Sequence, residues 1–226
     1  AARPAWLADQ QGGARSGALV DLASASPRAS ASALASASGS ASPSAPASAG
    51  DGAAPGLVPL DRGPFGLEDG YALSSLADAP GRFGGVRYRL GTALALRGTH
   101  PRAGDLPERI AIPIGRAAGT VAFLHATGWY AAEGETVGRY EIVHADGVRS
   151  EVPLVYGANV AAWTETEVDT LDLEQPWQGR TPNGLPVAAY QLRWRNPRPD
   201  VPIDRIEIVA GGGIAAPIVF GVTLLD

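Results

Sequence analysis

The feature that most constrains the fold is an alternation of apolar and polar residues that recurs from about residue 57 to the end of the chain. Successive side chains of a β-strand point to opposite faces, so this alternation is typical of strands with one buried face. Gly, Pro and Asp separate the runs at short intervals, and no i, i+3, i+4, i+7 stripe persists. The sequence therefore predicts an all-β domain, a β-sandwich or jelly roll. The predicted strands are 86–97, 109–114, 120–126, 137–144, 149–156, 187–195, 203–209 and 217–224.

The segment GRYEIVHADGVRSEVPLVYG gives the clearest local prediction. Asp146 and Gly147 form an Asp-Gly pair, which favours a tight type I′ turn whose two central residues have positive φ. Ahead of the turn, Tyr140 and His144 share one face of the strand, and the strand after the turn alternates likewise. We therefore expect a β-hairpin across residues 137–156.

Residues 22–56 contain little besides Ala, Ser, Pro and Gly. Side chains this small cannot offset the entropy lost on ordering, so the stretch is expected to be a flexible tether, or a strap that a partner orders. Residues 1–21 are a short docking segment or a frayed terminus. The β-sandwich domain is expected to span residues 57–226. The candidate partner-binding residues of the arm are Trp6, Leu19, Val20 and Leu22.

Composition bears on the partner and the compartment. The formal net charge is −5, and nucleic-acid binding requires a basic face, so no nucleic-acid partner is expected. All 18 basic residues are Arg, and the chain has no Cys, which removes disulfides and thiolate sites. The start AARPAW lacks Met, as expected of either a fragment or a processed chain, and its small residues suit removal of a signal peptide. We therefore expect an extracytoplasmic protein, periplasmic or at the cell surface.

The uncharged segment 208–225 reaches the length of a membrane span. Three consecutive Gly residues and Pro217 divide it into two short, β-branched arms. Two buried strands around a Gly-rich turn are therefore expected here, and no membrane span is expected in this chain.

Five segments resemble a known domain in their order and spacing: FLHAT, VGRYEIVHADG, VPLVYGANVAAW, YQLRWRNPRPDVPIDRIEIV and AAPIVFGVTL. Over about residues 57–226 the chain resembles an uncharacterised bacterial extracytoplasmic β-sandwich domain, which recurs at the ends of surface, regulatory and polysaccharide-related proteins. The fold that the resemblance implies is similar to galactose-binding-like jelly rolls, which often bind sugars at their loop ends. No catalytic residue is carried over, and His144 stands where the family usually has Tyr.

None of the three histidines has a second ligand or a catalytic group at the sequence spacing that a metal site or an active site requires. His125, in FLHATGWY, shares a strand face with Val121 and Phe123, which predicts a neutral core residue with one ring nitrogen bonded to the backbone. His100 is expected to be solvated, and His144 exposed or half-buried. No pair has the spacing of a zinc site, so no metal, cofactor or catalytic residue is predicted.

An acidic run occupies residues 165–174. In a strand, Glu165, Glu167 and Asp169 would share a face, where three carboxylates can bind Ca²⁺ if loops converge on them. We expect instead a solvated edge strand whose charges discourage pairing with another chain. No motif indicates the two carboxylates that a glycosidase needs across a cleft.

Aromatic residues in or beside loops are the stronger candidates for a binding site. Large aromatic side chains stack on sugars or fill a partner's pocket, but they also form lids over the ends of a sandwich. Trp163 is favoured because it follows a strand end beside Asn159. The candidate ligand-binding residues are Trp129, Tyr130, Asn159, Trp163 and Trp177.

The favoured function is a non-catalytic extracytoplasmic recognition or assembly module that binds a carbohydrate or a protein partner through its loop aromatics. The alternative is a structural accessory subunit, anchored by its extended N-terminal arm to a larger membrane-associated or filamentous complex. A glycan-active enzyme comes third. The arm separates the first two, because a sugar-binding module needs it only as a linker.

Overall fold

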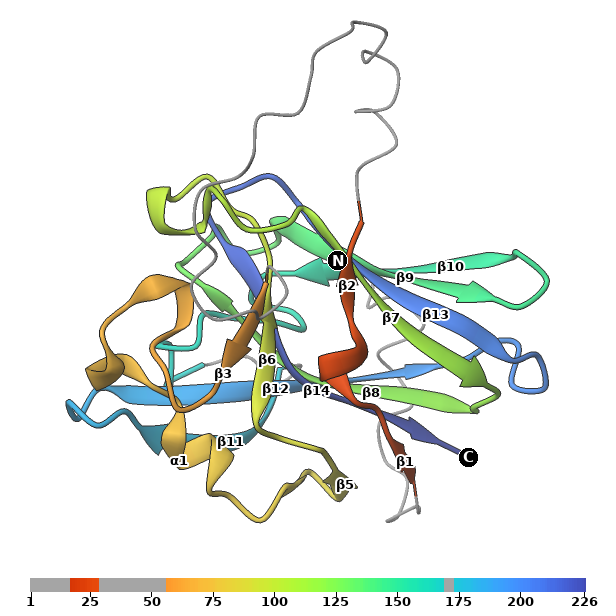
Figure 1. Cartoon of the computed structure of the whole chain (residues 1–226), viewed down its shortest axis with the longest axis horizontal. Coiled ribbons are helices and arrows are strands. Elements are labelled where there is room, and N and C mark those ends of the chain that lie inside the picture. Colours follow the sequence, from red (N-terminus) through yellow and green to blue (C-terminus); the bar gives the residue numbers. More distant parts are fainter. Residues whose placement is uncertain (1–16, 29–55, 169–172) are drawn as a thin grey trace, which may run out of the picture.

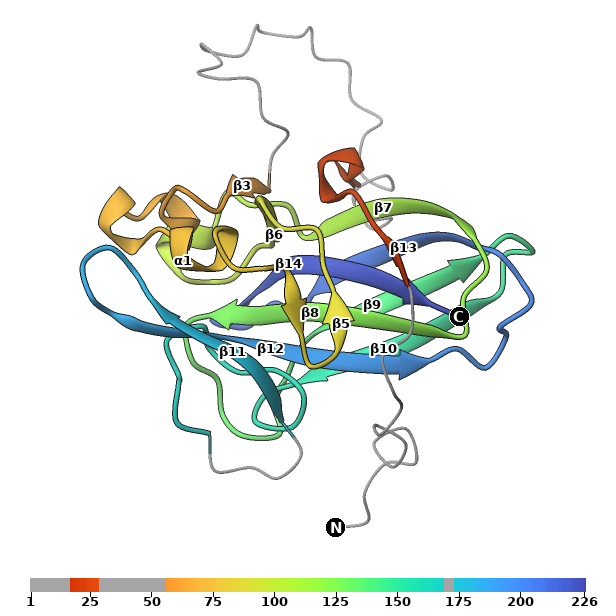
Figure 2. The same ribbon diagram turned by 90° about the horizontal axis from the view of Figure 1, so that it is seen from below.

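The computed structural model of the protein describes residues 17–28, 56–168 and 173–226. Two antiparallel sheets pack face to face (Figures 1 and 2). Sheet A has seven strands, in the order β11 (Glu174–Arg180), β12 (Pro186–Arg195), β8 (Thr120–Gly128), β14 (Ala216–Leu225), β6 (Thr92–Ala95) and β3 (Leu57–Pro59), with β1 (Gly17–Leu19) also paired to β14. Sheet B has five strands, in the order β10 (Arg149–Val155), β9 (Thr136–His144), β13 (Ile203–Ala210), β7 (Arg109–Arg116) and β2 (Ser26–Pro27).

The strand order is that of a jelly roll. Strands β6, β7, β8 and β9 alternate between the two sheets along the chain, and β12, β13 and β14 alternate again. As a result β14 lies between β6 and β8, and β13 lies between β7 and β9. This interleaving of two antiparallel sheets confirms the predicted all-β sandwich.

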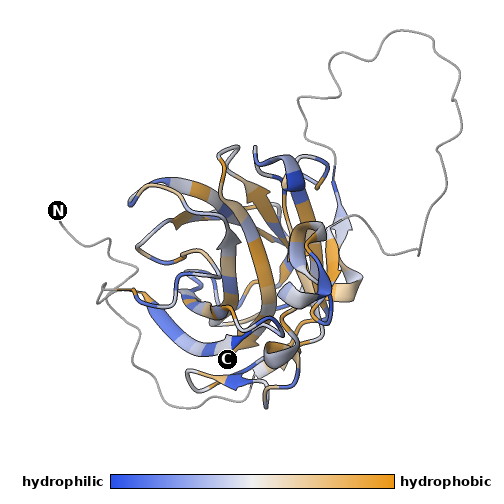
Figure 3. Ribbon diagram, turned by 90° about the vertical axis from the view of Figure 1, so that its left-hand side faces the viewer, coloured by the Kyte–Doolittle hydropathy of each residue, from blue (hydrophilic) through white to orange (hydrophobic). Residues whose placement is uncertain are grey.

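One hydrophobic core fills the space between the sheets. Figure 3 shows apolar residues concentrated in the strands, while the connections are more hydrophilic. Phe123 of sheet A stacks on Tyr140 of sheet B, with ring centroids 3.8 Å apart and ring planes 8° apart. Both side chains are fully buried. The alternation seen in the sequence therefore places every second residue of these strands in the core.

Residues 60–91, which follow β3, cover part of the outer face of sheet A (Figure 1, orange and yellow). They include the short helix α1 (Ser74–Ala77) and a small hairpin of β4 (Arg82–Phe83) and β5 (Val86–Arg87). The remaining helical turns are short 3-10 helices at Leu22–Ser24, Pro64–Gly66, Asp69–Tyr71 and Pro101–Ala103.

The single strand predicted at residues 86–97 is wrong. It is divided into β5 and β6, because Gly91 adopts a φ of 137° that a side chain would disfavour. Between the two strands, Tyr88 lies against Gly221, where an added Cβ would come within 2.9 Å of the ring. The Tyr88 hydroxyl donates a hydrogen bond of 2.8 Å to Gln191 of β12. The break thus turns Tyr88 onto the outer face of sheet A.

The edge strand expected at residues 165–174 is also misplaced. Residues 164–168 form no strand, and residues 169–172 lie outside the described part of the chain. The strand at this edge of sheet A is β11, which begins only at Glu174. Pro176 and Gly179 are strand-breaking residue types, and they hid β11 from the sequence pattern.

The β9–β10 hairpin forms, but its turn differs from the predicted type I′. Gly147 has a φ of 85°, whereas Asp146 is not in the positive-φ region. The His144 carbonyl accepts from the Gly147 N–H, and the His144 N–H donates to the Val148 carbonyl, both over 2.9 Å. This is a tight turn followed by a left-handed glycine, a longer loop that requires only one residue with positive φ.

Residues 17–28 belong to the sandwich, although the domain was predicted to begin at residue 57. Strand β1 pairs with the end of β14, and β2 pairs with β7, so this segment crosses from sheet A to sheet B (Figure 1, red). We call residues 17–28 the strap. Val20, Leu22 and Ala25 of the strap are buried in the core. A few well-placed apolar anchors, which average composition does not reveal, therefore hold it.

The terminal strands of both sheet orders contain proline. Proline lacks the N–H that a pairing strand would require, so it weakens an edge as a template for another chain. The four prolines are Pro27 in β2, Pro59 in β3, Pro153 in β10 and Pro176 in β11.

The uncharged segment 208–225 forms the end of β13, a connection at residues 211–215, and β14. The predicted pair of buried strands around a Gly-rich turn is confirmed. Within the described ranges, the helices are too short or too polar to cross a membrane.

Candidate functional site

The longer connections of the sandwich gather at one end. The register pairs Ala216 with Gly128 and Val209 with Arg109, so β14 and β7 begin where β8 and β13 end. We call this region the loop end; it comprises residues 96–108, 129–135, 156–168 and 211–215. Four of the five predicted ligand-binding residues, Trp129, Tyr130, Asn159 and Trp163, lie here.

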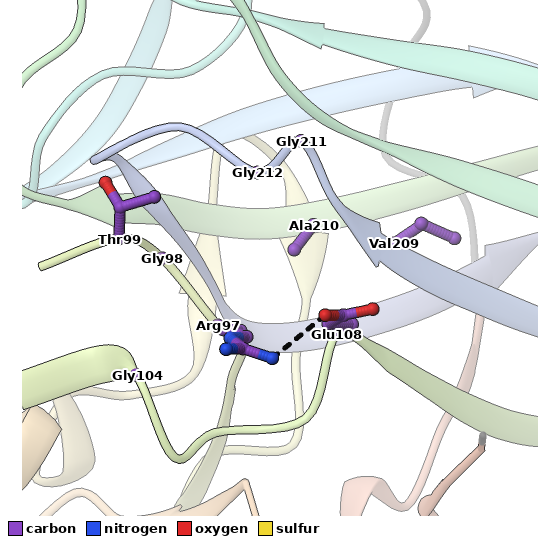
Figure 4. A pocket seen from close by; sticks show the side chains of 9 residues that line it. All are labelled: Arg97, Gly98, Thr99, Gly104, Glu108, Val209, Ala210, Gly211 and Gly212. Carbon is purple, nitrogen blue, oxygen red and sulfur yellow. Dashed lines mark hydrogen bonds and ion pairs between the residues drawn. The ribbon is translucent and has the colours of Figure 1, made fainter. Parts of the chain in front are cut away.

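A pocket of about 590 Å³ opens at the loop end, between residues 96–108 and 211–215 (Figure 4). Its polar side chains are Arg97, Thr99 and Glu108. Arg97 Nη1 donates to Glu108 Oε1 over 2.9 Å, and both side chains are half-exposed. The remaining lining residues are Gly98, Gly104, Val209, Ala210, Gly211 and Gly212. The pocket therefore presents a donor and an acceptor side by side against walls of glycine backbone.

Close backbone packing requires glycine at two positions of the pocket wall, Gly98 and Gly211. A Cβ on Gly98 would lie 2.9 Å from the Ile214 carbonyl oxygen, and one on Gly211 would lie 2.6 Å from the Val137 backbone. The Thr99 N–H donates to the Gly213 carbonyl over 2.9 Å, which joins the two connections. The two connections that form the pocket walls are thus held together by backbone contacts.

Gly104 differs from the other glycines of the pocket. It has a φ of −63° and a ψ of −32°, which any residue adopts, and the nearest atom to an added Cβ is 3.6 Å away. A larger residue here is compatible with the backbone and would occupy space in the pocket.

Trp129 lies beside the pocket but has little free surface for a ligand. His100, which follows Thr99, stacks on Trp129 with ring centroids 3.9 Å apart. Phe65 packs against the same indole at 4.6 Å. Phe65 and Trp129 have φ values of 57° and 63°, an unfavourable conformation for bulky residues. Trp129 is therefore packed against two other rings, unlike the residue that follows it.

That residue, Tyr130, is the exposed aromatic of the loop end. Its side chain is 55% exposed, and its hydroxyl lies 3.0 Å from Thr164 Oγ1. Ile214, in the connection at residues 211–215, is also exposed. Tyr130 thus offers a ring face at the edge of the strained cluster.

The three other predicted ligand-binding residues pack or form hydrogen bonds within the protein itself. Trp163, the residue we favoured, is only 5% exposed and presents no face to a ligand. A residue just beyond a strand end can also cover the core, and Trp163 does so. Asn159 is buried, accepts from the Val155 N–H and donates to the Pro153 carbonyl, both over 2.9 Å. Trp177 lies in β11 and packs partly against the core.

His125 is a core residue, as predicted. Its Nε2 donates to the Asn159 carbonyl over 2.9 Å, and its Nδ1 accepts from the Tyr140 hydroxyl at 2.8 Å. Burial lowers the pKa of His125 to about 4, although the bond to Asn159 acts in the opposite direction. The ring is therefore neutral at pH 7 and serves the fold.

The other two histidines also have structural contacts. His144 was expected to be exposed or half-buried, but it is 1% exposed, with Nε2 3.2 Å from Asn196 Oδ1. The β12–β13 connection, which carries Asn196, covers it. His100 stacks on Trp129 and accepts a hydrogen bond from the Arg102 N–H. In the described segments, no group of three or more His, Cys, Asp or Glu residues is arranged to hold a metal ion.

The predicted partner-binding residues of the arm fall into three groups. Val20 and Leu22 are buried within this chain's own sandwich, whereas Leu19 is exposed. Trp6 lies outside the described residues, as does the stretch 29–55 of the predicted tether.

A second polar cluster, on the outer face of sheet B, was missed from the sequence. Glu141 of β9 and Glu207 of β13 are directly opposite each other in the register, and their side chains are 6% and 3% exposed. Five arginines surround these two carboxylates, and we call them the guanidinium cluster: Arg28, Arg109, Arg139, Arg149 and Arg205.

The arginine contacts within this cluster lower the pKa values of both carboxyl groups. Hydrogen bonds from Arg109, and then Arg139, lower the pKa of Glu141 to about 2 despite its burial. Burial raises the pKa of Glu207, but bonds from Arg205 and Arg109 outweigh it and the net shift is downward. Both glutamates are therefore ionised at neutral pH.

A repeat in the sequence signals this cluster. The pattern Arg-x-Glu-Ile-Val occurs at residues 139–143 and again at residues 205–209. The two copies lie on neighbouring antiparallel strands with their glutamates paired. The pocket carries no comparable signal, because Arg97 and Glu108 are brought together only by the fold.

Comparison with protein-family models finds no matching family, and comparison with curated proteins finds no matching protein.

Proposed function

We propose that this protein is a non-catalytic extracytoplasmic recognition module that binds a carbohydrate in the pocket at the loop end. The observation that carries the proposal is the Arg97–Glu108 pair, which is half-exposed within a pocket of about 590 Å³. The volume lies within the range of small-ligand sites. The compartment is proposed from the domain resemblance described above.

The chemistry of the pocket suits neighbouring sugar hydroxyls. Each hydroxyl both donates and accepts, so one can donate to Glu108 while the next accepts from Arg97, with Thr99 adding a group that does either. Tyr130 offers an exposed ring face on which a sugar ring can stack.

The two other functions receive less support. A structural subunit anchored by its arm would need arm residues to face a partner, but Val20 and Leu22 are used within this chain. A glycosidase needs two carboxylates across its cleft, and Glu108 is the single carboxylate among the lining residues of the described pocket.

The test is a binding screen of the purified chain against a panel of oligosaccharides, followed by calorimetry with the best binder. Arg97→Gln removes the charged donor and is expected to weaken binding by about ten-fold or more. Gly104→Phe is expected to weaken binding by occupying the pocket, without loss of folding.

Arg116→Gln is the matched control. Arg116 is half-exposed like Arg97 and also forms one ion pair, with Asp226, but it lies at the far end of β7. Equal losses in Arg97→Gln and Arg116→Gln, or no binding by any member of the panel, would contradict the proposed function.

A further inference from the structure

The pocket and the guanidinium cluster form one continuous surface. Val209 lines the pocket, and the register places it between Arg139 and Arg109 on the outer face of sheet B. Glu108 of the pocket directly precedes Arg109 of the cluster. A ligand that extends from the pocket along sheet B therefore meets the guanidinium cluster first.

Fold stability alone does not explain the cluster. Like charges directly opposite each other on neighbouring strands repel, and part of the arginine contacts serves to offset this repulsion between Glu141 and Glu207. Buried ionic networks are often no more stabilising than apolar residues of similar volume. The two carboxylates hold five guanidinium groups together on the outer face of sheet B.

The cluster retains capacity for an anion. Five guanidinium groups meet four carboxylates here, Glu141 and Glu207 at the centre of the cluster and Glu151 and Asp204 beside Arg139 and Arg205, so positive charge is in excess by a single group. The side chains of Arg28 and Arg149 are 49% and 51% exposed. A guanidinium has five N–H donors in a planar fork that matches a carboxylate, and Arg149 contacts Glu141 through one nitrogen.

We propose that the ligand of the pocket is an acidic polysaccharide, whose carboxylate groups lie on the guanidinium cluster while a neighbouring sugar unit occupies the pocket. This inference rests on the proposed function, since the pocket defines the sugar end of the ligand. An acidic peptide would satisfy the guanidinium groups, but it would leave the donor and acceptor of the pocket without sugar hydroxyls.

The experiment compares one oligosaccharide with itself after a single chemical change. The intact chain is titrated with an oligomer of galacturonic acid and with the same oligomer after reduction of its carboxyl groups to alcohols. The acidic form is expected to bind about ten-fold more tightly at low salt, and high salt is expected to reduce that advantage. Arg149→Gln and Arg28→Gln are expected to shrink the advantage, while Arg116→Gln leaves it unchanged.

The outcomes separate the two proposals. Equal binding of the acidic and reduced oligomers overturns the acidic ligand but leaves the carbohydrate function standing. Binding of neither oligomer, in a chain that also binds nothing in the panel, overturns both. If polyglutamate competes for the site as well as the uronate oligomer does, charge attraction alone explains the binding. That result overturns the proposal that the ligand is a polysaccharide. Thermal melts of the Arg variants identify any loss of binding that arises from unfolding.

Discussion

At the scale of single residues, burial and hydrogen bonding separate structural groups from candidate ligand contacts. His125 and Asn159 both occur in segments that look functional in the sequence, but the His125 ring bonds to the Asn159 carbonyl, and the Asn159 side chain bonds to the backbone of β10. Arg97 lies in an unremarkable loop, yet its guanidinium faces a pocket. Residue type therefore indicates less about function than the environment that folding gives to it.

The buried imidazole of His125 predicts a dependence of stability on pH. Its pKa is 6.5 in the unfolded chain and about 4 in the folded protein, so between these values the unfolded chain binds a proton that the folded protein does not. The free energy of unfolding should therefore fall as the pH decreases through 6.5, by about 3 kcal/mol in total near pH 4. Urea unfolding at a series of pH values measures this loss.

The control for this prediction is His125→Gln, which cannot take up the proton. The lowered pKa of Glu141, about 2 against an ordinary 4.5, gives stability that is lost only as the pH falls below 4.5, so it affects both proteins alike. If the two proteins lose stability equally between pH 6.5 and 4.5, the assignment of this dependence to His125 is wrong.

At the scale of elements, the strap shows how little pairing an N-terminal segment needs in order to dock. β1 contributes three residues and β2 two, on different sheets. Such short strands gain little from their ladders alone, so the buried anchors between them supply most of the attachment. Arg28 at the end of the strap adds a contact to Glu207.

Replacement of Leu22, which is 3% exposed, is expected to destabilise the protein. Leu22→Ala should lower the free energy of unfolding by about 2–5 kcal/mol, since it leaves a cavity beneath the strap. Leu19→Ala is the matched change at an exposed strap position and should cost less than about 0.5 kcal/mol. Denaturant unfolding of both variants, with hydrogen exchange of residues 17–28, tests the docking; equal effects in the two variants would refute it.

At the scale of the whole molecule, the sequence predicts the sandwich better than the site. Alternation located most of the long strands, because the period of a strand is fixed by its geometry. β11 was missed because Pro176 and Gly179 do not favour strands, and the strap was missed because three anchors are lost in a small-residue background. The pocket depends on residues 97 and 108 meeting across a connection, and no local pattern encodes such a meeting.

The prolines of the terminal strands have a consequence for many molecules at once. A polymer with repeated binding units brings several copies of a module close together, and that proximity multiplies their effective affinity. The same proximity raises the local concentration of the copies, which favours irreversible pairing between unprotected sheet edges. If the protein binds such a polymer as proposed, Pro27, Pro59, Pro153 and Pro176 interrupt those borders, and we expect dense coverage of the polymer to stay reversible.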